Sequence, residues 1–478
     1  MSSPSVTNKQ GREVDASLLD RFAAIVGNKY LITDPAEQEP YLIEPRGLYH
    51  GQTPAVLRPG TVTEVAAILK LANETRTPVV PQGGNTGLVA GQIPHAGDLV
   101  LSLNRLDRIR EVDATSNTMT CDAGVILAKA QEAAAAAERL FPLSLAAEGS
   151  CTIGGNLATN AGGTAVLAYG NARDLVLGLE VVLADGRVWN GLSKLKKDNT
   201  GYDLKNLFIG AEGTLGVITA AVLKLYPRPR AVETAFVGLA SPADALALFS
   251  LAGERAGGTV TSFELMSRTS VAFALRHGPG CRDPLGAPHP WYVLIELSSQ
   301  AAGLRGALED LLTAAVEQGR VADATIAASL DQRKAFWHVR DMLSDVQRFE
   351  GGSIKHDVSV PVASVPDFIA QASAAVEALI PGCRPAAFGH LGDGNVHFNV
   401  SQPIGADAAA YLARWDDMGA VVNRIVTQLH GSISAEHGIG QLKRDLLPTV
   451  KGTVALDLMR ALKRTLDPNG ILNPVKVL

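Results

Sequence analysis

The chain has 478 residues, of which 46% are hydrophobic and 19% charged, and its formal net charge is −5. This composition is typical of a globular protein with roughly two to four domains, and the charge argues against nucleic acid or an anionic membrane as a partner. We expect a cytoplasmic protein without a transmembrane segment, because no apolar secretion signal and no run of about 18 apolar residues is present. A reducing compartment also fits the scattered cysteines, which form no CxxC pair and lie at 121, 151, 281 and 383.

Strand and helix patterns alternate over the first 225 residues. Apolar residues at 65, 68, 69 and 71 repeat at helical spacing and predict a helix over residues 61–76. The elements predicted after it are strands at 78–81 and 98–103, a strand pair at 109–121 that turns at 113–117, a helix at 124–139, and strands at 175–183 and 215–225. The Pro227-Arg228-Pro229 segment then marks a boundary.

The remaining residues predict an α+β region followed by helices. Its predicted elements are strands at 234–239 and 291–297, a hairpin at 388–400, and helices at 242–255, 301–318 and 365–379. A long helix is expected over 406–430, and a last one over 453–466 that stops at Asp467-Pro468-Asn469-Gly470. We expect this tail to return to the first domain.

Three glycine-rich stretches lie between residues 82 and 219, at 82–87, 148–163 and 210–219. Glycines let the backbone turn inward, so that successive N–H groups converge on an anion such as a pyrophosphate. One such loop is a weak signal because most glycine-rich turns are only turns, but three are hard to explain in that way. No G-x-G-x-x-G is present and no lysine follows the glycines, which disfavours a Rossmann site or a P-loop and leaves other dinucleotide sites open.

A histidine-containing hairpin is predicted around Asp393-Gly394, a favoured two-residue loop of the type I′ turn. This turn would pair 392 with 395, 391 with 396 and 390 with 397. His390 and His397 would then face each other with Cβ atoms roughly 5 Å apart, and Asn399 would share their face. With Glu436 as the carboxylate, they would hold a divalent ion and leave positions open, as catalytic sites do. The alternative is a pair of buried histidines that are only hydrogen-bonded.

These motifs together resemble the flavoprotein family of vanillyl-alcohol-oxidase type, and within it the D-2-hydroxyacid dehydrogenases, with the D-2-hydroxyglutarate branch nearest. The resemblance runs from about residue 50 to the C-terminus and rests on PQGGNTG at 81–87, GSCTIGGN and TNAGG within 149–163, EGTLGVIT at 212–219, HxGDGNxHxN at 390–399, EHGIG at 436–440 and LDPNGILNP at 466–474. It implies an α+β fold with a two-subdomain FAD-binding domain, an α+β substrate-binding cap domain and a C-terminal helical segment that returns to the FAD domain. The expected limits are 1–228, 229–426 and 427–478.

The resemblance implies FAD as the cofactor. The residues that it assigns to FAD are Pro81, Gly83, Gly84, Asn85, Thr86, Gly87, Ser150, Gly154, Gly155, Asn156, Thr159, Gly162, Gly163 and Ile218. Some members of the family tether FAD through a histidine of the glycine-rich loop. Residues 82–91 contain no histidine, so the FAD is expected to be non-covalent.

The same resemblance matches His390, His397 and Glu436 to metal ligands, in agreement with the hairpin argument. Zn²⁺ is our first choice, with Mn²⁺ and Co²⁺ also compatible with two imidazoles and a carboxylate. Such an ion would stabilise the alkoxide of a chelated 2-hydroxy acid. His437 is then placed as the general base and Asn399 as a residue that orients the substrate. The alternative for His437 is a cap residue beside a glycine turn.

Substrate specificity is expected to come from Arg340, Ser344 and Lys355. The first two lie four apart on one helical face, and the three together would clamp a distal carboxylate. The alternative is that Arg340 pairs with a nearby acid such as Asp341 or Asp345. The D-2-hydroxyglutarate branch of the family carries Arg, Thr and Lys at these positions, so this chain favours a dicarboxylate, with Ser344 in place of Thr.

Four other functions stay open from the sequence. They are a dehydrogenase of D-lactate or another D-2-hydroxy acid, an O₂-using 2-hydroxyacid oxidase on the same fold, and, less favoured, an aromatic-alcohol oxidase or a non-enzymatic binding protein. The expected partners are a small D-2-hydroxy acid and an electron acceptor such as an electron-transfer flavoprotein or a quinone. The sequence does not decide whether the chain forms a homodimer.

Overall fold

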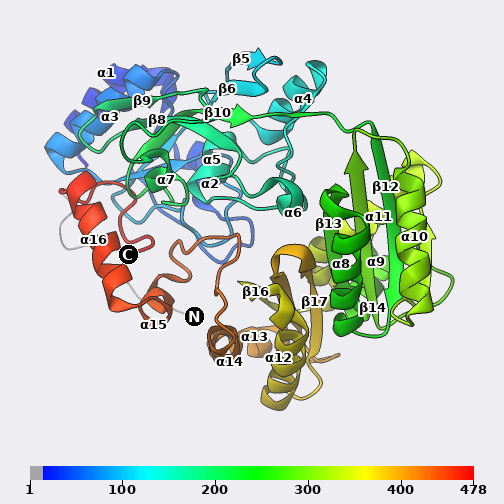
Figure 1. Cartoon of the computed structure of the whole chain (residues 1–478). Helices are drawn as coiled ribbons and strands as arrows, with labels where there is room; N and C mark the ends of the chain where they lie inside the picture. The colour runs from blue at the N-terminus through cyan, green and yellow to red at the C-terminus, as the bar shows by residue number, and fades with distance from the viewer. Residues whose placement is uncertain (1–13) are drawn as a thin grey trace.

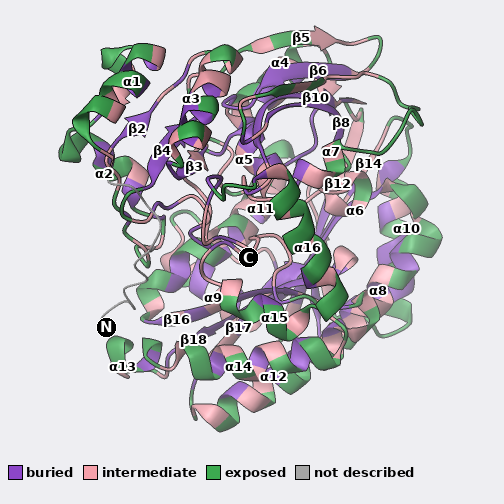
Figure 2. Cartoon of the chain, turned by 90° about the vertical axis from the view of Figure 1, so that its left-hand side faces the viewer, coloured by how far each residue is buried: buried purple, intermediate pink, exposed green. Residues whose placement is uncertain are grey.

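The computed structural model describes residues 14–478 and contains two halves, each built on β-sheet, with the last helices placed beside the first half (Figure 1). The first half holds a four-stranded and a five-stranded sheet, and the second half holds one seven-stranded sheet. Purple strands run through the interior of both halves in Figure 2, while the helices present green faces to solvent. Within residues 14–478, no helix combines the length and the apolar character needed to cross a bilayer.

The four-stranded sheet carries the first glycine-rich loop. Its strands are, in order, β1 (Leu31–Ile32), β2 (Val56–Leu57), β4 (Leu99–Ser102) and β3 (Val79–Gln82), and the nearby helices are α1 (Ala16–Val26), α2 (Pro35–Leu42) and α3 (Val62–Thr75). Helix α3 begins after Thr61, whose hydroxyl accepts a hydrogen bond from the Glu64 N–H at 3.2 Å, and it ends at Arg76 in the left-handed region. The helix predicted at 61–76 and the strands predicted at 78–81 and 98–103 are therefore confirmed.

The five-stranded sheet is antiparallel throughout. Its order is β5 (Ile109–Asp113), β6 (Thr118–Asp122), β10 (Val217–Lys224), β8 (Val176–Val182) and β9 (Val188–Gly191). Helix α4 (Leu127–Ala136) is shorter than the helix predicted at 124–139, because Ile126 is still extended and Glu138 adopts a positive φ of 56°. The short elements of this half are β7 (Arg139–Leu140), α5 (Ile153–Ala158), α6 (Val166–Tyr169), α7 (Lys205–Phe208) and β11 (Tyr226–Pro227).

The seven-stranded sheet of the second half is antiparallel and lies between two layers of helices. Its order is β15 (Asp323–Ile326), β12 (Ala231–Leu239), β14 (Trp291–Ser299), β13 (Val260–Ser267), β17 (Arg384–His390), β18 (Asn395–Ser401) and β16 (Ser353–Ser359). One face packs on α8 (Pro242–Arg255), α10 (Leu304–Glu317), α12 (Val365–Leu379) and α14 (Trp415–Gln428). The other face packs on α9 (Arg268–His277) and α11 (Leu330–Asp345).

The long helix predicted at 406–430 is wrong, because the chain forms two helices there, α13 (Ala408–Leu412) and α14. Tyr411 is buried, and its hydroxyl donates a hydrogen bond to the Val400 carbonyl at 2.7 Å. This contact ties α13 to the end of β18, and the chain turns at Ala413 and Arg414 before α14 begins.

The hairpin register also differs from the prediction. His397 pairs with Phe388 rather than with His390, because residues 391–393 form a 3₁₀ turn and lengthen the connection. His390 also lies beside Glu264 on β13, the other neighbour of β17 in the sheet. The difference amounts to two residues, which preserves the face of every side chain, since strand side chains alternate with a period of two.

The last elements, α15 (Leu447–Val450) and α16 (Thr453–Leu466), lead the chain back to the first half (Figure 1). Leu472 forms a parallel bridge with Val79 of β3, and the Asp467 carboxylate accepts hydrogen bonds from the N–H groups of Ile471 and Leu472. The predicted return of the C-terminal segment is confirmed.

Candidate active site

The glycine-rich loops enclose a cavity of about 290 Å³ in the first half. Their glycines are needed for close packing of backbone on backbone: a Cβ on Gly84 would lie 1.9 Å from the Ser150 carbonyl oxygen, and one on Gly83 would lie 2.3 Å from the Thr152 hydroxyl. The cavity is therefore a cradle that larger residues would fill, and its glycine-rich walls suit a dinucleotide such as FAD.

Most of the residues expected to contact FAD line this cavity. They are Pro81, Gly83, Gly84, Asn85, Thr86, Gly87, Gly154, Gly155, Asn156, Thr159, Gly162 and Ile218. Ser150 and Gly163 do not line it. The Ser150 side chain is exposed, and Gly163 packs so closely on the Ser144 carbonyl that a Cβ would lie 1.9 Å from it.

The EHGIG motif at 436–440 also contributes two residues to the wall of this cavity. Glu436 and His437 line it together with the loops. A Cβ on Gly162 would lie 3.0 Å from the Glu436 carboxylate oxygen Oε1, so the second glycine-rich stretch directly contacts this acid. The cavity expected to hold the cofactor is thus continuous with the residues expected to perform the chemistry.

His390, His397 and Glu436 form a cluster whose ligand atoms all lie within 4.8 Å of one another. The His390 Nε2 atom lies 3.6 Å from Glu436 Oε1, and the rings of His390 and His397 are 5.7 Å apart. The structure therefore brings the three predicted ligands together in spite of the changed hairpin register. Two imidazoles and one carboxylate at this spacing suit a divalent ion with open coordination positions.

Glu264, which the sequence reasoning missed, contacts His390, the first of the three predicted ligands. Its buried carboxylate lies 2.7 Å from His390 Nδ1 and accepts a hydrogen bond from Arg340 Nε at 2.8 Å. Burial alone would raise the pKa of Glu264, but His390 and Arg340 lower it to about 2. A carboxylate that accepts from Nδ1 leaves Nε2 as the ligand atom, as is usual for metal-bound histidine.

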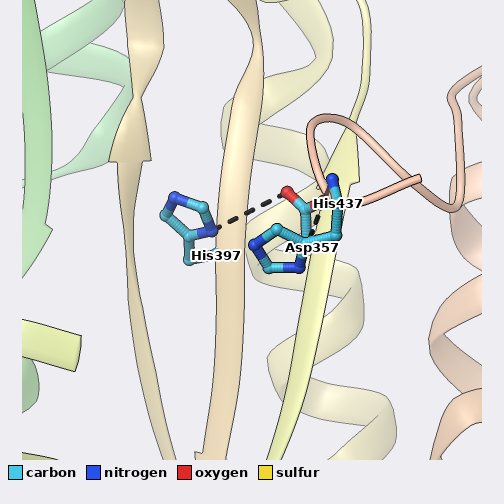
Figure 3. Close-up of side chains that lie close together, drawn as sticks. All are labelled: Asp357, His397 and His437. Atoms are coloured by element: carbon cyan, nitrogen blue, oxygen red, sulfur yellow. Dashed lines mark hydrogen bonds and ion pairs between the residues drawn. The ribbon is translucent and has the colours of Figure 1, made fainter. Parts of the chain in front are cut away.

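Asp357, also missed, lies beside both His397 and His437 (Figure 3). It lies 3.8 Å from His397 Nδ1 and 3.5 Å from His437 Nδ1, and its Oδ2 accepts the backbone N–H groups of Glu436 and His437 at 2.9 Å. Although burial would raise the pKa of Asp357, the nearby His437, Lys443 and His397 hold it well below its usual range. This anion fixes the loop at 436–437 against strand β16.

The position and the pKa of His437 suit a general base. Burial lowers the pKa of His437, and Asp357 offsets part of that lowering, so the imidazole is neutral near pH 7 and able to take a proton. Its ring stacks on that of His397, with ring centroids 6.2 Å apart.

The residues expected to bind the substrate converge on the same sheet face. Lys355 pairs with Asn399 across β16 and β18, and strand alternation places both on the side of Asp357 and His397. The Asn399 amide donates to Gln347 at 2.9 Å, and the Lys355 ammonium donates to the backbone carbonyl of Ser344 at 3.3 Å. The Ser344 side chain itself is exposed.

Arg340 lies on α11 and pairs with Glu264, not with Asp341 or Asp345 as the alternative reading of the sequence suggested. Its Nη2 atom lies 3.3 Å from His390 Nε2, so the guanidinium is directly beside the predicted metal site. Arg340 also lines a second cavity of about 1060 Å³ between the two halves, which shares Leu145 and Ala146 with the first cavity.

Comparison with known proteins agrees with this fold. Residues 53–191 match the model of the FAD binding domain, and residues 228–477 match that of the FAD linked oxidases, C-terminal domain. The mitochondrial D-2-hydroxyglutarate dehydrogenase of Bos taurus is 39% identical over 94% of this chain and 81% of its own length. The D-2-hydroxyglutarate dehydrogenase of Xanthomonas citri is 36% identical over 94% of both chains.

The solved structure of p-cresol methylhydroxylase with bound substrate shares the fold, with a TM-score of 0.76, 17% identity and 96% coverage of both chains. The chain therefore belongs to the FAD-linked oxidases, flavoenzymes of the vanillyl-alcohol-oxidase type. Within this family it is an oxidoreductase homologous to the D-2-hydroxyglutarate dehydrogenases over nearly its full length. The family and the fold class predicted from the sequence are confirmed.

Replacing Glu264 by glutamine should weaken metal binding by about 10 to 100-fold while FAD stays bound, because outer-shell carboxylates fix the tautomer and orientation of a histidine ligand. The measurement is the dissociation constant of Zn²⁺ at constant pH. Glu309→Gln is the matched control, since Glu309 is exposed and forms only a surface ion pair with Arg305. Equal zinc affinities of the two variants would contradict this role for Glu264.

Proposed function

We propose that this protein oxidises a D-2-hydroxy acid, with D-2-hydroxyglutarate as the best-supported substrate and 2-oxoglutarate as the product. The observation that carries the proposal is the position of Glu436 and His437. They line the cavity formed by the glycine-rich loops, and Glu436 also belongs to the cluster of His390 and His397. One site thus combines a cofactor cradle, a set of metal ligands and a base.

When bound, FAD accepts a hydride, and a divalent ion lowers the pKa of an alcohol that it polarises. The protein supplies the remaining functions. His390, His397 and Glu436 would hold the ion, and Pro81 to Gly87 with the residues of the second and third glycine-rich stretches would hold the FAD. Zn²⁺ is the proposed metal, and the absence of histidine from residues 82–91 supports non-covalent FAD.

His437 takes the proton from the substrate's 2-hydroxyl group. Its burial keeps the imidazole neutral before the reaction, and the Asp357 carboxylate stabilises the imidazolium that forms. Asn399, held by Gln347, orients the substrate on the same sheet face. These groups act on atoms shared by all 2-hydroxy acids, so they do not select among them.

We assign the selection among 2-hydroxy acids to the residues that would bind the distal end of the substrate. Lys355 lies on the face that carries Asn399, and burial lowers the pKa of its ammonium, with Arg46 adding to the lowering. A second carboxylate would relieve this repulsion, whereas the methyl group of D-lactate would not. The relatives named above as D-2-hydroxyglutarate dehydrogenases support the same choice, and D-lactate dehydrogenation is the second candidate.

Lys355→Met should raise KM for D-2-hydroxyglutarate by more than about tenfold and hardly change that for D-lactate. The reason is that a hydrogen bond to a charged group typically contributes ~1.5 to 3 kcal/mol. Lys334→Met is the control, because Lys334 is an exposed lysine on α11. Equal losses on both substrates would count against the assignment of Lys355.

The function itself is tested by a flavin-bleaching screen. The metal-replete, FAD-loaded protein is mixed anaerobically with D-2-hydroxyglutarate, L-2-hydroxyglutarate, D-lactate and an aromatic alcohol, and the flavin absorbance is followed. The proposal predicts fastest bleaching by D-2-hydroxyglutarate and none by its L enantiomer. Bleaching by the aromatic alcohol alone would overturn it. Peroxide formed during aerobic turnover would indicate an oxidase, and its absence would favour an electron-transfer flavoprotein or a quinone as acceptor.

A further inference from the structure

Asn473 carries an unpaired acceptor beside the cofactor cavity. The residue is 2% exposed and lines this cavity. Its side-chain Nδ2 donates to the Gly91 carbonyl at 2.9 Å and to the Glu212 carbonyl at 2.7 Å. Its Oδ1 atom is buried and has no hydrogen-bond partner among residues 14–478. A buried acceptor without a partner costs free energy, so this oxygen is expected to serve a bound molecule.

The orientation of this amide is fixed by its neighbours. Both atoms near Nδ2 are carbonyl oxygens, which accept and cannot donate, so the NH₂ group must face them and the oxygen must face away. The backbone is fixed as well, since the Asn473 N–H donates to the Val79 carbonyl at 2.8 Å. The oxygen is therefore preorganised and needs no rearrangement to accept a hydrogen bond.

Asn473 lies near the catalytic end of the cavity. Glu212, whose carbonyl accepts from Asn473, uses its carboxylate to accept from the N–H groups of Ile439 at 2.7 Å and Gly440 at 2.8 Å. These two residues directly follow His437 and Gly438. Glu212 thus links Asn473 to the loop that carries the proposed base, His437. The flavin ring must lie at this end of the cavity to exchange a hydride with the substrate.

We propose that Asn473 Oδ1 accepts a hydrogen bond from the N3–H group of the flavin ring, the one ring N–H donor of oxidised FAD. This inference rests on FAD as the cofactor but not on the identity of the substrate. Asn473 is then a cofactor-positioning residue, which places the ring in register with the loop that carries His437. It lies in the C-terminal segment, so the return of the chain to the first half completes the flavin site.

The test compares FAD with N3-methyl-FAD, which lacks this donor. FAD is removed, and the apoprotein is titrated with each flavin without substrate or metal. The wild type should bind N3-methyl-FAD at least about tenfold more weakly than FAD. In Asn473→Ala this ratio should fall to within about twofold of unity.

Gln82→Ala is the matched control. Gln82 is another buried amide that lines the cavity, its Nε2 donates to the carbonyls of Tyr41 and Gln92, and its Oε1 also lacks a partner among residues 14–478. Gln82 lies in the loop proposed to hold FAD, so this variant is expected to bind both flavins more weakly, but it should keep the wild-type ratio of the two affinities. Equal binding of both flavins by the wild type would overturn the proposal without recourse to any variant. The proposal would also be overturned if Asn473→Ala kept the wild-type ratio, or if Gln82→Ala abolished it. Since no substrate is present, failure here leaves the proposed function untouched.

Discussion

Replacing His437 by alanine is expected to slow flavin reduction by D-2-hydroxyglutarate by about 10² to 10⁴-fold, the usual contribution of a positioned general base. Among residues 14–478, the neighbouring His397 and His390 are predicted metal ligands and Asp357 is held as a carboxylate, so none of the three is arranged to replace it. Flavin and metal should both remain bound, since the loops and the three ligands are unchanged. The measurement is the anaerobic rate of loss of flavin absorbance at saturating substrate.

His50→Ala provides the control for this variant. The His50 side chain is 57% exposed and pairs only with Glu39 at the surface, so its loss should leave the rate of flavin reduction unchanged. A His437→Ala protein that kept full metal and flavin content and reduced its flavin at the wild-type rate would show that His437 is a structural residue of its glycine turn.

Replacing His397 by alanine is expected to weaken metal binding by more than about 100-fold, which exceeds the effect typical of an outer-shell partner. His397 supplies one of the three ligand atoms of the cluster and also contacts Asp357, so no other residue takes its place. Flavin reduction should be lost with the metal, while FAD binding should persist, because His397 does not line the cofactor cavity. Metal content and flavin absorbance are measured on the same sample.

His356 offers a matched control on the adjacent strand. It is a buried histidine of β16. Because side chains alternate along a strand, His356 points to the face opposite Lys355 and Asp357. On that face its strand neighbours Ile354 and Val358 belong to the hydrophobic core of the second half. His356→Ala should lower stability yet keep the metal. Equal loss of metal from both variants would mean that the effect of His397→Ala is a general disturbance of the sheet.

The sequence predicted those parts of the molecule that depend on local pattern. Helix α3 has an N-cap at Thr61 and a clear apolar stripe, and the strand pair at 109–122 has a turn at Asn117, so both were predicted within a few residues. The grouping of His390, His397 and Glu436 was also predicted, although through a wrong register. Asp393-Gly394 favours a two-residue turn locally, but residues 391–393 form a 3₁₀ turn that lengthens the connection.

Glu264 and Asp357 were missed because their roles depend on residues far away in sequence. Glu264 is an acid between Phe263 and Leu265 in a strand, which is itself a signal, since a buried carboxylate requires a partner. The signal for Asp357 was different: it lies two residues from Lys355 on one strand, so both share a face. The partner of Glu264 could not be identified from the sequence, because the β13 to β17 pairing joins segments more than 100 residues apart.

His390, His397 and Glu436 are proposed to hold a divalent ion that the oxidation requires. The most direct test is anaerobic mixing of D-2-hydroxyglutarate with two samples of the FAD-loaded wild-type protein, one containing metal and one stripped of it with EDTA and analysed for residual ions. We predict that only the metal-containing sample bleaches, and that added Zn²⁺, Mn²⁺ or Co²⁺ restores bleaching to the other. Bleaching at the same rate in the metal-free sample would contradict the account.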